Sequence, residues 1–357
     1  MNKIKINPTN ASRLNEVDFD NIPFGKVFSD HMFTATYEDG RWKDFTIEPT
    51  RNINVHPAMM ALHYGQSIFE GMKATVDQEG TPLLFRPEKH IERLNASAQR
   101  MCMPDFPRDV FLDAIHALVD TDREWIPPQE GSALYIRPFM FATDEYIGVT
   151  ASKAYKFIIL TLPVGPYYSK PVSLKVERKY VRAVRGGVGE AKTCGNYAAS
   201  LLPAKLAVEE GFDQVMWMDA HEFKYIQEVG TMNLFFVFKD RIVTPATDGA
   251  ILKGITRMSI IDYLKGEGHD VQEYPLTIDE VKETYNKGEL VEAFGSGTAA
   301  VIANISRIKD TDIDMKFDES NWKLSKSVKA FINGVRIGKK TDKYGWIVPV
   351  EQHAEKS

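Results

Sequence analysis

The sequence has little cysteine. Among 357 residues there are two cysteines, Cys102 and Cys194, and they do not form a CxxC pair. Two isolated thiols provide no disulfide framework and suit a reducing compartment. Residues 1–16 lack the apolar core of a signal peptide, and no apolar run reaches the roughly 18 residues that a membrane helix needs. We therefore expect a cytoplasmic protein that does not associate with a membrane.

Basic charge and metal-ligand motifs are also scarce. Asp and Glu number 49 against 44 Lys and Arg, which gives a formal net charge of −5. Without a basic excess, nucleic acid is not the expected partner. The eight histidines are scattered, with no HExxH motif and no Cys/His cluster, so no metal site is expected. The stretch GSGT at 295–298 does not match the GxSxG motif of serine hydrolases.

The chain is long enough for one large domain or two ordinary ones, and 43% of it is hydrophobic. In its first half, Pro87 and a stripe at helical spacing predict a helix over 87–101. Two strands are predicted at 132–141 and 156–164. The Pro-, Gly- and Ser-rich stretch 165–173 reads as a linker. We therefore expect two domains, 1–168 and 169–357. The predicted helical stripe consists of Ile91, Leu94, Ala98 and Met101.

The second half continues with alternating patterns. A strand is expected in VSLKVER, and a helix from about residue 196 contains Pro203, which predicts a kink or a later start. A further helix should end near Gly266. Overall, the fold class is predicted to be α/β, with mixed α and β elements. The other expected elements are strands at 214–218 and 233–238, a helix at 255–265, a strand before 295 and a helix at 319–334.

The stretch RGGVGEAKTCGNYAAS, residues 185–200, resembles a damaged phosphate loop. A Walker A loop would need glycine at position 191, where the chain has Ala191. A dinucleotide fingerprint would need glycine at position 192, where it has Lys192. Nucleotide binding by a degenerate loop and a solvated loop lysine both remain open. A third reading is a lysine near a helix start, where a neutral amine suited to imine formation is favoured.

A lysine that forms an imine with a cofactor aldehyde requires an anion site, a carboxylate and a substrate pocket. The segment GITR at 254–257 opens an amphipathic helix, and helix N-termini bind phosphate. The segment GSGT offers a second glycine-rich turn. Glu228 stands just before an almost wholly apolar strand, and a buried carboxylate needs a positive or hydrogen-bonding partner.

These segments together resemble the branched-chain amino-acid aminotransferases, which are pyridoxal-phosphate enzymes of fold type IV. The resemblance covers nearly the whole chain. It implies a two-domain fold, with a small N-terminal α/β domain and a larger pseudo-barrel domain that binds the cofactor. The matching segments are FGKVFSDHM (24–32), LHYGQSIFEGMKA (62–74), LFRPEKHIERLNASAQRMCMP (84–104), LYIRP (134–138), GGVGEAKTCGNYAAS (186–200), QEVGTMNLFFV (227–237), GAILKGITR (249–257) and FGSGTAAV (294–301).

On this resemblance, Lys192 bonds to pyridoxal 5′-phosphate and moves a proton during the reaction. Glu228 pairs with the pyridine nitrogen, and Tyr197 hydrogen-bonds the ring hydroxyl. Arg93 binds the phosphate, although its place outside the apolar stripe would otherwise indicate a solvated charge. Arg182 contacts the cofactor in one branch of the family. The remaining phosphate contacts implied are Ile255, Thr256 and Thr298.

The resemblance implies transfer of the amino group of leucine, isoleucine or valine to 2-oxoglutarate, giving the 2-oxo acid and glutamate. Arg137 would meet the distal carboxylate, whereas Thr231 and Ala299 would hold the α-carboxylate. A homodimer whose sites are completed across the interface is also implied. The aromatic wall of the pocket would be Phe24, Tyr64, Phe69 and Tyr135; without the family match, core packing would be the ordinary role of each.

The chain departs from the family pattern at Cys194, where relatives have glycine. A buried, structural thiol is expected there. The redox CxxC of the animal mitochondrial form would fall at Ala300 and Ala303, so that switch is absent. Two alternatives keep the fold and change the chemistry: a D-amino-acid aminotransferase and an aminodeoxychorismate lyase. The motifs GGVGxAK and EVGTMN favour the branched-chain enzyme.

Overall fold

The computed structural model describes residues 4–165 and 170–352, and the chain divides into two compact units. The N-terminal unit comprises Met1–Tyr167, Ala191–Cys194 and Gly334–Ser357, and the C-terminal unit comprises Tyr168–Glu190 and Gly195–Asn333. Beyond residue 168, the segments Ala191–Cys194 and Gly334–Ser357 also belong to the N-terminal unit, and the predicted linker at 165–173 lies partly outside the described residues.

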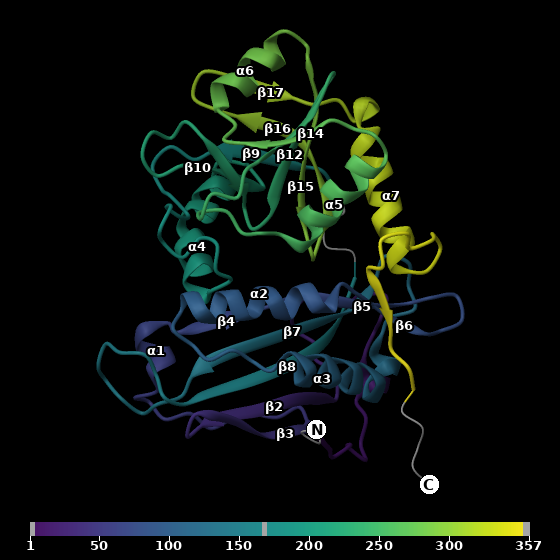
Figure 1. Ribbon diagram of the computed structural model, residues 1–357. Coiled ribbons are helices and arrows are strands. Elements are labelled where there is room, and N and C mark those ends of the chain that lie inside the picture. Colours follow the sequence, from purple (N-terminus) through teal and green to yellow (C-terminus); the bar gives the residue numbers. More distant parts are fainter. Residues whose placement is uncertain (1–3, 166–169, 353–357) are drawn as a thin grey trace. The chain divides into compact units, whose positions relative to one another are not determined.

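The N-terminal unit is built on a nine-stranded sheet with the order β1-β3-β2-β8-β7-β5-β6-β18, and β4 pairs with β7 (Figure 1). All of its pairs are antiparallel except β1 with β3. Strand β18 comes from the C-terminal part of the chain. The strands are β1 (Lys5–Ile6), β2 (His31–Glu38), β3 (Arg41–Pro49), β4 (Ser67–Phe69), β5 (Met72–Val76), β6 (Pro82–Phe85), β7 (Ala133–Ala142), β8 (Tyr155–Val164) and β18 (Ile347–Pro349).

Helix α2 (Pro87–Arg100) confirms the helix predicted from the apolar stripe. Ile91, Leu94 and Ala98 are fully buried in one core with side chains of the sheet, among them Leu134 and Ile136 of β7. Tyr135, on the opposite face of β7, belongs to a different cluster, as the period of two predicts. The other helices of this unit are α1 (Met60–Tyr64), α3 (Arg108–Thr121) and two short 3-10 turns at Leu14–Glu16 and Arg123–Trp125.

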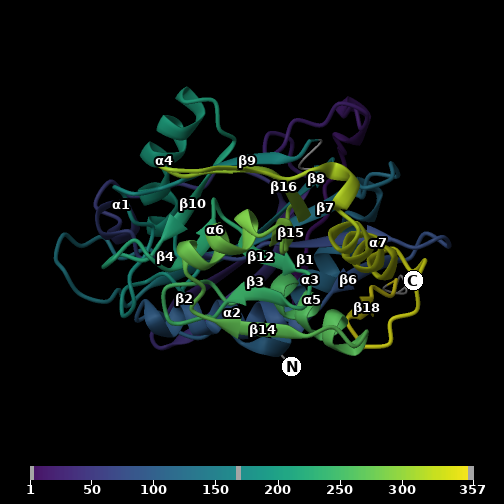
Figure 2. The same ribbon diagram turned by 90° about the horizontal axis from the view of Figure 1, so that it is seen from above.

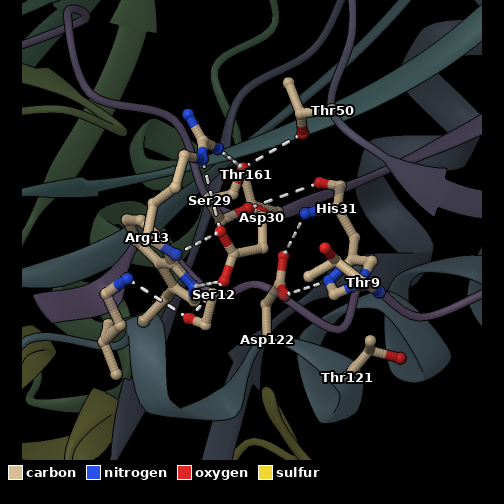
Figure 3. Close-up of polar contacts among 12 residues, drawn as sticks. Thr9, Ser12, Arg13, Ser29, Asp30, His31, Thr50, Thr121, Asp122 and Thr161 are labelled. Atoms are coloured by element: carbon tan, nitrogen blue, oxygen red, sulfur yellow. Dashed lines mark hydrogen bonds and ion pairs between the residues drawn. The ribbon is translucent and has the colours of Figure 1, made fainter. Parts of the chain in front are cut away.

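A buried polar cluster fixes the N-terminal segment on this unit (Figure 3). The carboxylate of Asp30 accepts hydrogen bonds from the Ser12 hydroxyl at 2.6 Å, the Arg13 backbone N–H at 3.0 Å and the Trp125 indole at 3.0 Å. Burial alone would raise the pKa of Asp30, but these donors together lower it. The ionised carboxylate therefore holds three segments that are distant in sequence.

The same cluster contains a buried histidine (Figure 3). Nδ1 of His31 lies 2.6 Å from the Asp122 carboxylate, and its Nε2 accepts the Thr9 backbone N–H at 2.8 Å. An imidazole that accepts at Nε2 carries its proton on Nδ1, so the Asp122 contact fixes the tautomer.

The C-terminal unit contains a mixed nine-stranded sheet with the order β11-β10-β9-β16-β15-β12-β13-β14, and β17 pairs with β16 (Figure 2). Its strands bury large side chains, among them Trp217, Phe235, Phe236 and Phe294. The strands expected at 214–218 and 233–238 are confirmed. The strands are β9 (Val172–Val176), β10 (Gln214–Met218), β11 (Ile226–Val229), β12 (Asn233–Phe238), β13 (Ile242–Pro245), β14 (Val271–Tyr274), β15 (Leu290–Gly297), β16 (Val301–Lys309) and β17 (Asp314–Lys316).

The later helices are α4 (Cys194–Glu209), α5 (Ile255–Gly266), α6 (Ile278–Asn286) and α7 (Leu324–Arg336), with a 3-10 turn at Glu319–Asn321. Together with the two sheets, they confirm the mixed α and β fold class. Along the described chain, 4–165 and 170–352, no helix is long and apolar enough to cross a membrane.

The expected start of one helix is wrong. Helix α7 begins at residue 324 rather than 319, because the buried carboxylate of Glu292 accepts the backbone N–H groups of Lys323, Leu324 and Ser325 and so caps the helix there. Helix α4 begins at Cys194 and runs through Pro203, which removes one backbone donor, so of the two alternatives for this helix the later start is not observed and the kink stays a prediction.

Helix α4 exposes its large apolar side chains. Leu201 and Val208 are 69% and 61% exposed, whereas the buried residues of the helix are Asn196, Pro203 and Ala207. Ala207 packs with Trp217 and its neighbours in the C-terminal unit. Helix α4 therefore turns an apolar surface away from its own unit.

Candidate active site

Lys192 is held by its backbone on both sides. Its N–H donates to the Ser97 hydroxyl on α2 at 2.9 Å, and its carbonyl accepts the Phe69 N–H of β4 at 3.0 Å. The next residue, Thr193, donates its hydroxyl to the Ser67 carbonyl at 2.8 Å. These bonds explain why residues 191–194 belong to the N-terminal unit. The backbone of Lys192 is therefore fixed between α2 and β4.

The Lys192 side chain lies against an aromatic and cationic wall. Its Nζ is 4.9 Å from the centre of the Phe69 ring, and the guanidinium carbon of Arg137 is 4.7 Å from the same ring. Arg137 donates to the Tyr135 hydroxyl at 3.2 Å. Phe24 meets Tyr135 edge-on, with ring centres 6.0 Å apart. Four predicted substrate residues of this unit therefore form one connected group, which meets Lys192 at Phe69.

Gly71 shapes this wall. A Cβ at this position would come within 1.9 Å of the Tyr135 hydroxyl, so only glycine lets the ring lie there. Tyr64 does not join the wall. It lies on α1, 38% exposed, and its ring contacts His63. The structure of this single chain therefore separates Tyr64 from the other aromatic residues predicted to bind substrate.

Arg93 is not a solvated charge. Its side chain is 11% exposed, and it forms a two-pronged ion pair with the fully buried Glu70: Nε to Oε1 at 2.7 Å and Nη2 to Oε2 at 2.8 Å. Nδ1 of His90 lies 2.7 Å from the same carboxylate. Burial alone would raise the pKa of Glu70, but the charge and hydrogen bonds of Arg93 and the bond from His90 hold it well below its ordinary value.

In the C-terminal unit, Glu228 of β11 is a buried carboxylate with a cationic partner. It is 3% exposed, and its Oε2 lies 2.5 Å from Nη2 of Arg182. Its Oε1 accepts the Asn233 amide at 3.1 Å and the Leu252 N–H at 3.3 Å. The guanidinium and the two N–H donors supply the positive and hydrogen-bonding partners that a buried carboxylate needs. A buried carboxylate was expected to need a positive or hydrogen-bonding partner, and in this structure the positive partner of Glu228 is Arg182.

Arg182 is itself fixed by a second contact. Its Nη2 donates to the Ala250 carbonyl at 2.7 Å. Its buried Nε has no hydrogen-bond partner within the described residues. A buried donor of this kind is costly unless a bound group satisfies it, and an anionic or ring-hydroxyl oxygen is the chemistry that fits.

Helix α5 begins without a side-chain cap. Gly254 precedes the helix, and the first two helical residues, Ile255 and Thr256, are buried. A Cβ on Gly254 would come within 1.9 Å of the Asn233 amide oxygen. A buried helix N-terminus needs a partner for its N–H groups, and phosphate suits both these donors and the helix dipole.

The remaining candidates lie at the ends of elements. Thr298 and Ala299 form the turn between β15 and β16, both partly buried, and Thr231 is exposed in the turn before β12. Val301, which closes the first turn, has a φ of 59°. A β-branched residue in this region is strained, and such strain persists only where the surroundings fix the backbone. Tyr197 lies partly buried in the first turn of α4.

The glycine-rich stretch does not have the setting of a phosphate loop. Residues 185–190 form successive turns, and β9 ends at Val176, well before the glycines. A phosphate loop follows its strand directly and opens a helix. Cys194 opens α4 and is exposed, so the expectation of a buried thiol is wrong. It is not among the described residues with positive φ, which explains how cysteine replaces glycine there.

Sequence reasoning missed Glu70, His90, Ser97 and Asn233. Three polar residues of α2, His90, Arg93 and Ser97, recur at helical spacing beside the apolar stripe. This second stripe could have predicted that one polar edge of α2 faces buried groups. Glu70 had no such signal, because its partners come from another element.

Known proteins resemble this chain over most of its length. Residues 67–308 match the family described as Amino-transferase class IV. Branched-chain-amino-acid aminotransferase 2 of Bacillus subtilis (strain 168) is 46% identical over 339 residues, 93% of each chain. The solved Escherichia coli branched-chain amino acid aminotransferase is 26% identical with a TM-score of 0.74, over 90% of this chain and 99% of that one. The T.th. branched-chain amino acid aminotransferase solved with pyridoxamine 5′-phosphate is 25% identical with a TM-score of 0.70, over 89% and 98%.

These matches confirm the resemblance seen in the sequence segments. The family match spans more than half of the chain and includes Lys192, Glu228 and both glycine-rich turns that follow them. The chain therefore belongs to the class IV aminotransferases.

Proposed function

We propose that this protein is a pyridoxal-phosphate-dependent aminotransferase of branched-chain amino acids. It transfers the amino group of L-leucine, L-isoleucine or L-valine to 2-oxoglutarate, giving the 2-oxo acid and L-glutamate. The observation that carries the proposal is the anchored Lys192 beside an aromatic wall that also holds a cation, in a chain 46% identical to a branched-chain enzyme.

The residues present fit pyridoxal 5′-phosphate. Glu228 is buried beside Arg182, the start of α5 is buried and uncapped, and the Nε of Arg182 is a buried donor without a partner along 4–165 and 170–352. A protonated ring nitrogen, a phosphate and a ring oxygen match these groups. When bound, the cofactor supplies an aldehyde and an electron-withdrawing ring.

Lys192 would provide the amine that holds the cofactor, and it would act as the general base for the proton on the substrate Cα. A positioned base contributes about 10²–10⁴-fold to such a step. Glu228 would pair with the ring nitrogen, Tyr197 would hydrogen-bond the ring hydroxyl, and Arg182 would contact the ring. The phosphate would be held by Arg93, by the N–H groups of Ile255 and Thr256 and by the Thr298 hydroxyl.

The substrate side chain rests on the aromatic wall. Phe24, Phe69 and Tyr135 give apolar area to leucine, isoleucine and valine, and Arg137 meets the distal carboxylate of glutamate. Thr231 and the N–H of Ala299 hold the α-carboxylate. An apolar pocket discriminates by only about 1–3 kcal/mol per methylene, so similar rates are expected for the three branched substrates.

A homodimer is part of the proposal. The surface carries exposed apolar side chains that a single chain leaves in water, among them Leu62 and Tyr64 of α1 and Leu201, Leu202 and Val208 of α4. Apolar groups of this kind mark interfaces. Contact with a second copy would cover them and could bring Tyr64 to the partner's aromatic wall. Two exposed free cysteines, Cys102 and Cys194, suit the reducing cytoplasm.

The test is an absorption spectrum of the purified protein with pyridoxal phosphate, before and after adding L-leucine. We expect a yellow band that leucine converts to the amine-form spectrum, and no such band in Lys192→Ala. Lys287→Ala, at an exposed lysine on the end of α6, is the matched control. This variant should keep the yellow band and its conversion by leucine. A full turnover rate in Lys192→Ala contradicts the proposal. Conversion by D-alanine instead of leucine, or release of pyruvate, indicates the two alternative activities.

A further inference from the structure

Glu70 is the central acceptor of a buried cluster in the N-terminal unit. Its side chain is fully buried, and its two carboxylate oxygens accept from Arg93, from His90 and from the backbone N–H of Gly71 at 3.3 Å. Its own N–H donates to the Pro138 carbonyl of β7 at 2.7 Å. The carboxylate is therefore fixed to the sheet, and it fixes side chains of α2 in turn.

The contact with Arg93 defines the orientation of the guanidinium. Nε and Nη2 both donate to Glu70, at 2.7 and 2.8 Å, so one edge of the planar group is turned to the carboxylate. In a planar fork, this leaves Nη1 on the opposite edge. An arginine with one edge clamped loses little further side-chain freedom when an anion binds the other edge.

His90 is the second side chain of α2 that contacts Glu70, and it does so as a neutral group. Burial lowers the pKa of His90, and the nearby charges of Arg93 and Lys192 lower it further, while the bond to Glu70 opposes them. A neutral imidazole that faces a carboxylate through Nδ1 carries its proton there and donates it. The cluster therefore contains one negative and one positive charge, balanced without a second cation.

We propose that Glu70 is a positioning residue for cofactor phosphate, acting through Arg93 and supported by His90. This inference rests on the proposed function, because Arg93 is assigned to the phosphate there. Glu70 touches neither substrate nor cofactor. It sets the angle at which Arg93 offers its other edge, and α2 carries Arg93 and His90 one turn apart so that both reach the same carboxylate.

A salt bridge that only stabilises the fold would be buried in the same way. The two roles differ in what they do to ligands with and without phosphate. Loss of a positioning residue weakens binding of the phosphorylated ligand selectively, whereas loss of fold stability does not discriminate between the two ligands.

The experiment measures dissociation constants of pyridoxamine 5′-phosphate and pyridoxamine for the apoenzyme by fluorescence quenching. In Glu70→Gln we expect binding of the phosphorylated ligand to weaken about 10- to 100-fold, the equivalent of one charged hydrogen bond, with pyridoxamine changed less than about threefold. In an Arg93→Lys background, Glu70→Gln should add less than about threefold, because the two residues act as one unit.

A matched control is Asp310→Asn, which breaks another buried pair, with Arg178 and Lys282, in the other unit. It should leave the ratio of the two dissociation constants unchanged. The inference would be overturned if Glu70→Gln weakened the binding of both ligands equally. It would also be overturned if the losses of affinity from Arg93→Lys and from Glu70→Gln multiplied in the double variant. If the unsubstituted protein itself does not prefer the phosphorylated ligand, it is the proposed function that fails.

Should Glu70→Gln not fold, His90 provides the same test. His90→Phe removes the Nδ1 donor, and His90→Asn replaces it with an amide N–H at a similar position. We expect the phosphate-dependent affinity to fall in the first variant and to return towards the original value in the second. Identical ratios in both variants and in the unsubstituted protein contradict the positioning role.

Discussion

Single side chains in this protein take their roles from the groups that hold them. Lys192 reads as a loop lysine in the sequence, yet its backbone is bound on one side to α2 and on the other to β4. Arg93 reads as a solvated charge, yet it is nearly buried against Glu70. Both residues lie next to a fixed acceptor or donor, which is how a chemically demanding group is kept in one position.

Ser97 offers a test of this point. Its hydroxyl is 1% exposed, donates to the Arg93 carbonyl and accepts the Lys192 N–H. Ser97→Ala leaves that N–H buried without an acceptor, which costs about 1–3 kcal/mol. We expect a lower free energy of unfolding and faster hydrogen exchange at the Lys192 amide. Ser200→Ala on α4, which removes only a bond within its own helix, is the control. Unchanged exchange at Lys192 contradicts the prediction.

Lys73 of β5 gives a prediction on pH. Burial, with the charge of Arg336, lowers its pKa from 10.5 to about 7. Between these values the unfolded chain binds more protons than the folded protein, so stability should rise with pH from about 7 to 10. One pKa unit corresponds to about 1.4 kcal/mol, so the effect is at most a few kcal/mol.

Lys73→Met removes this titration. We expect the variant to be more stable near pH 7 and its stability to be flatter up to pH 10, measured by urea unfolding at several pH values. Lys89→Met, at a more exposed lysine on α2, should leave the slope in place. An unchanged slope in Lys73→Met would show that another group titrates in this range.

At the scale of elements, helix ends are set by partners that lie far away in sequence. Helix α7 starts where Glu292 of β15 accepts its first N–H groups, whereas α5 has no side-chain cap at its buried start. Helix α4 contains a proline and turns Leu201 and Val208 outwards. Periodicity shows that a helix exists, but such partners decide its limits and its faces.

Glu292 provides the element-scale prediction. Its carboxylate accepts three backbone N–H groups and the Ser325 hydroxyl, and it is 2% exposed. Glu292→Gln replaces one acceptor oxygen by a donor, which should destabilise the protein by about 1–3 kcal/mol. The denaturant midpoint should fall, and the first turn of α7 should exchange faster. Glu289→Gln, at an exposed position, should change neither; an equal fall there contradicts a capping role.

At the scale of the whole molecule, the exposed apolar side chains of α1 and α4 predict a second copy of the chain. Leu201→Glu together with Leu202→Glu places charge on the surface that a partner would cover. We expect a dimer by analytical ultracentrifugation for the unsubstituted protein and a shift towards monomer for the double variant. Ile6→Glu, at another exposed apolar position, is the control. A double variant that sediments as the original dimer would place the interface elsewhere.

Much of the fold could be predicted from the sequence. The stripe of α2 and the apolar runs of β8 and β12 appear with bounds close to those expected, because their periods follow from burial of one face or of both. The start of α7 was predicted wrongly and the exposed apolar face of α4 was not predicted, because each depends on groups outside the helix itself.

The sequence by itself determined the family, and it predicted Lys192 and the other candidate site residues. Eight segments in register specify a family more tightly than any one motif does. Only the tertiary structure decided that Lys192 belongs with the N-terminal unit, that Arg182 pairs with Glu228, and that Arg93 is clamped by Glu70. The physical reason is that an ion pair or hydrogen bond depends on distance in space, and the partners lie between 23 residues (Arg93 and Glu70) and 123 residues (Lys192 and Phe69) apart along the chain.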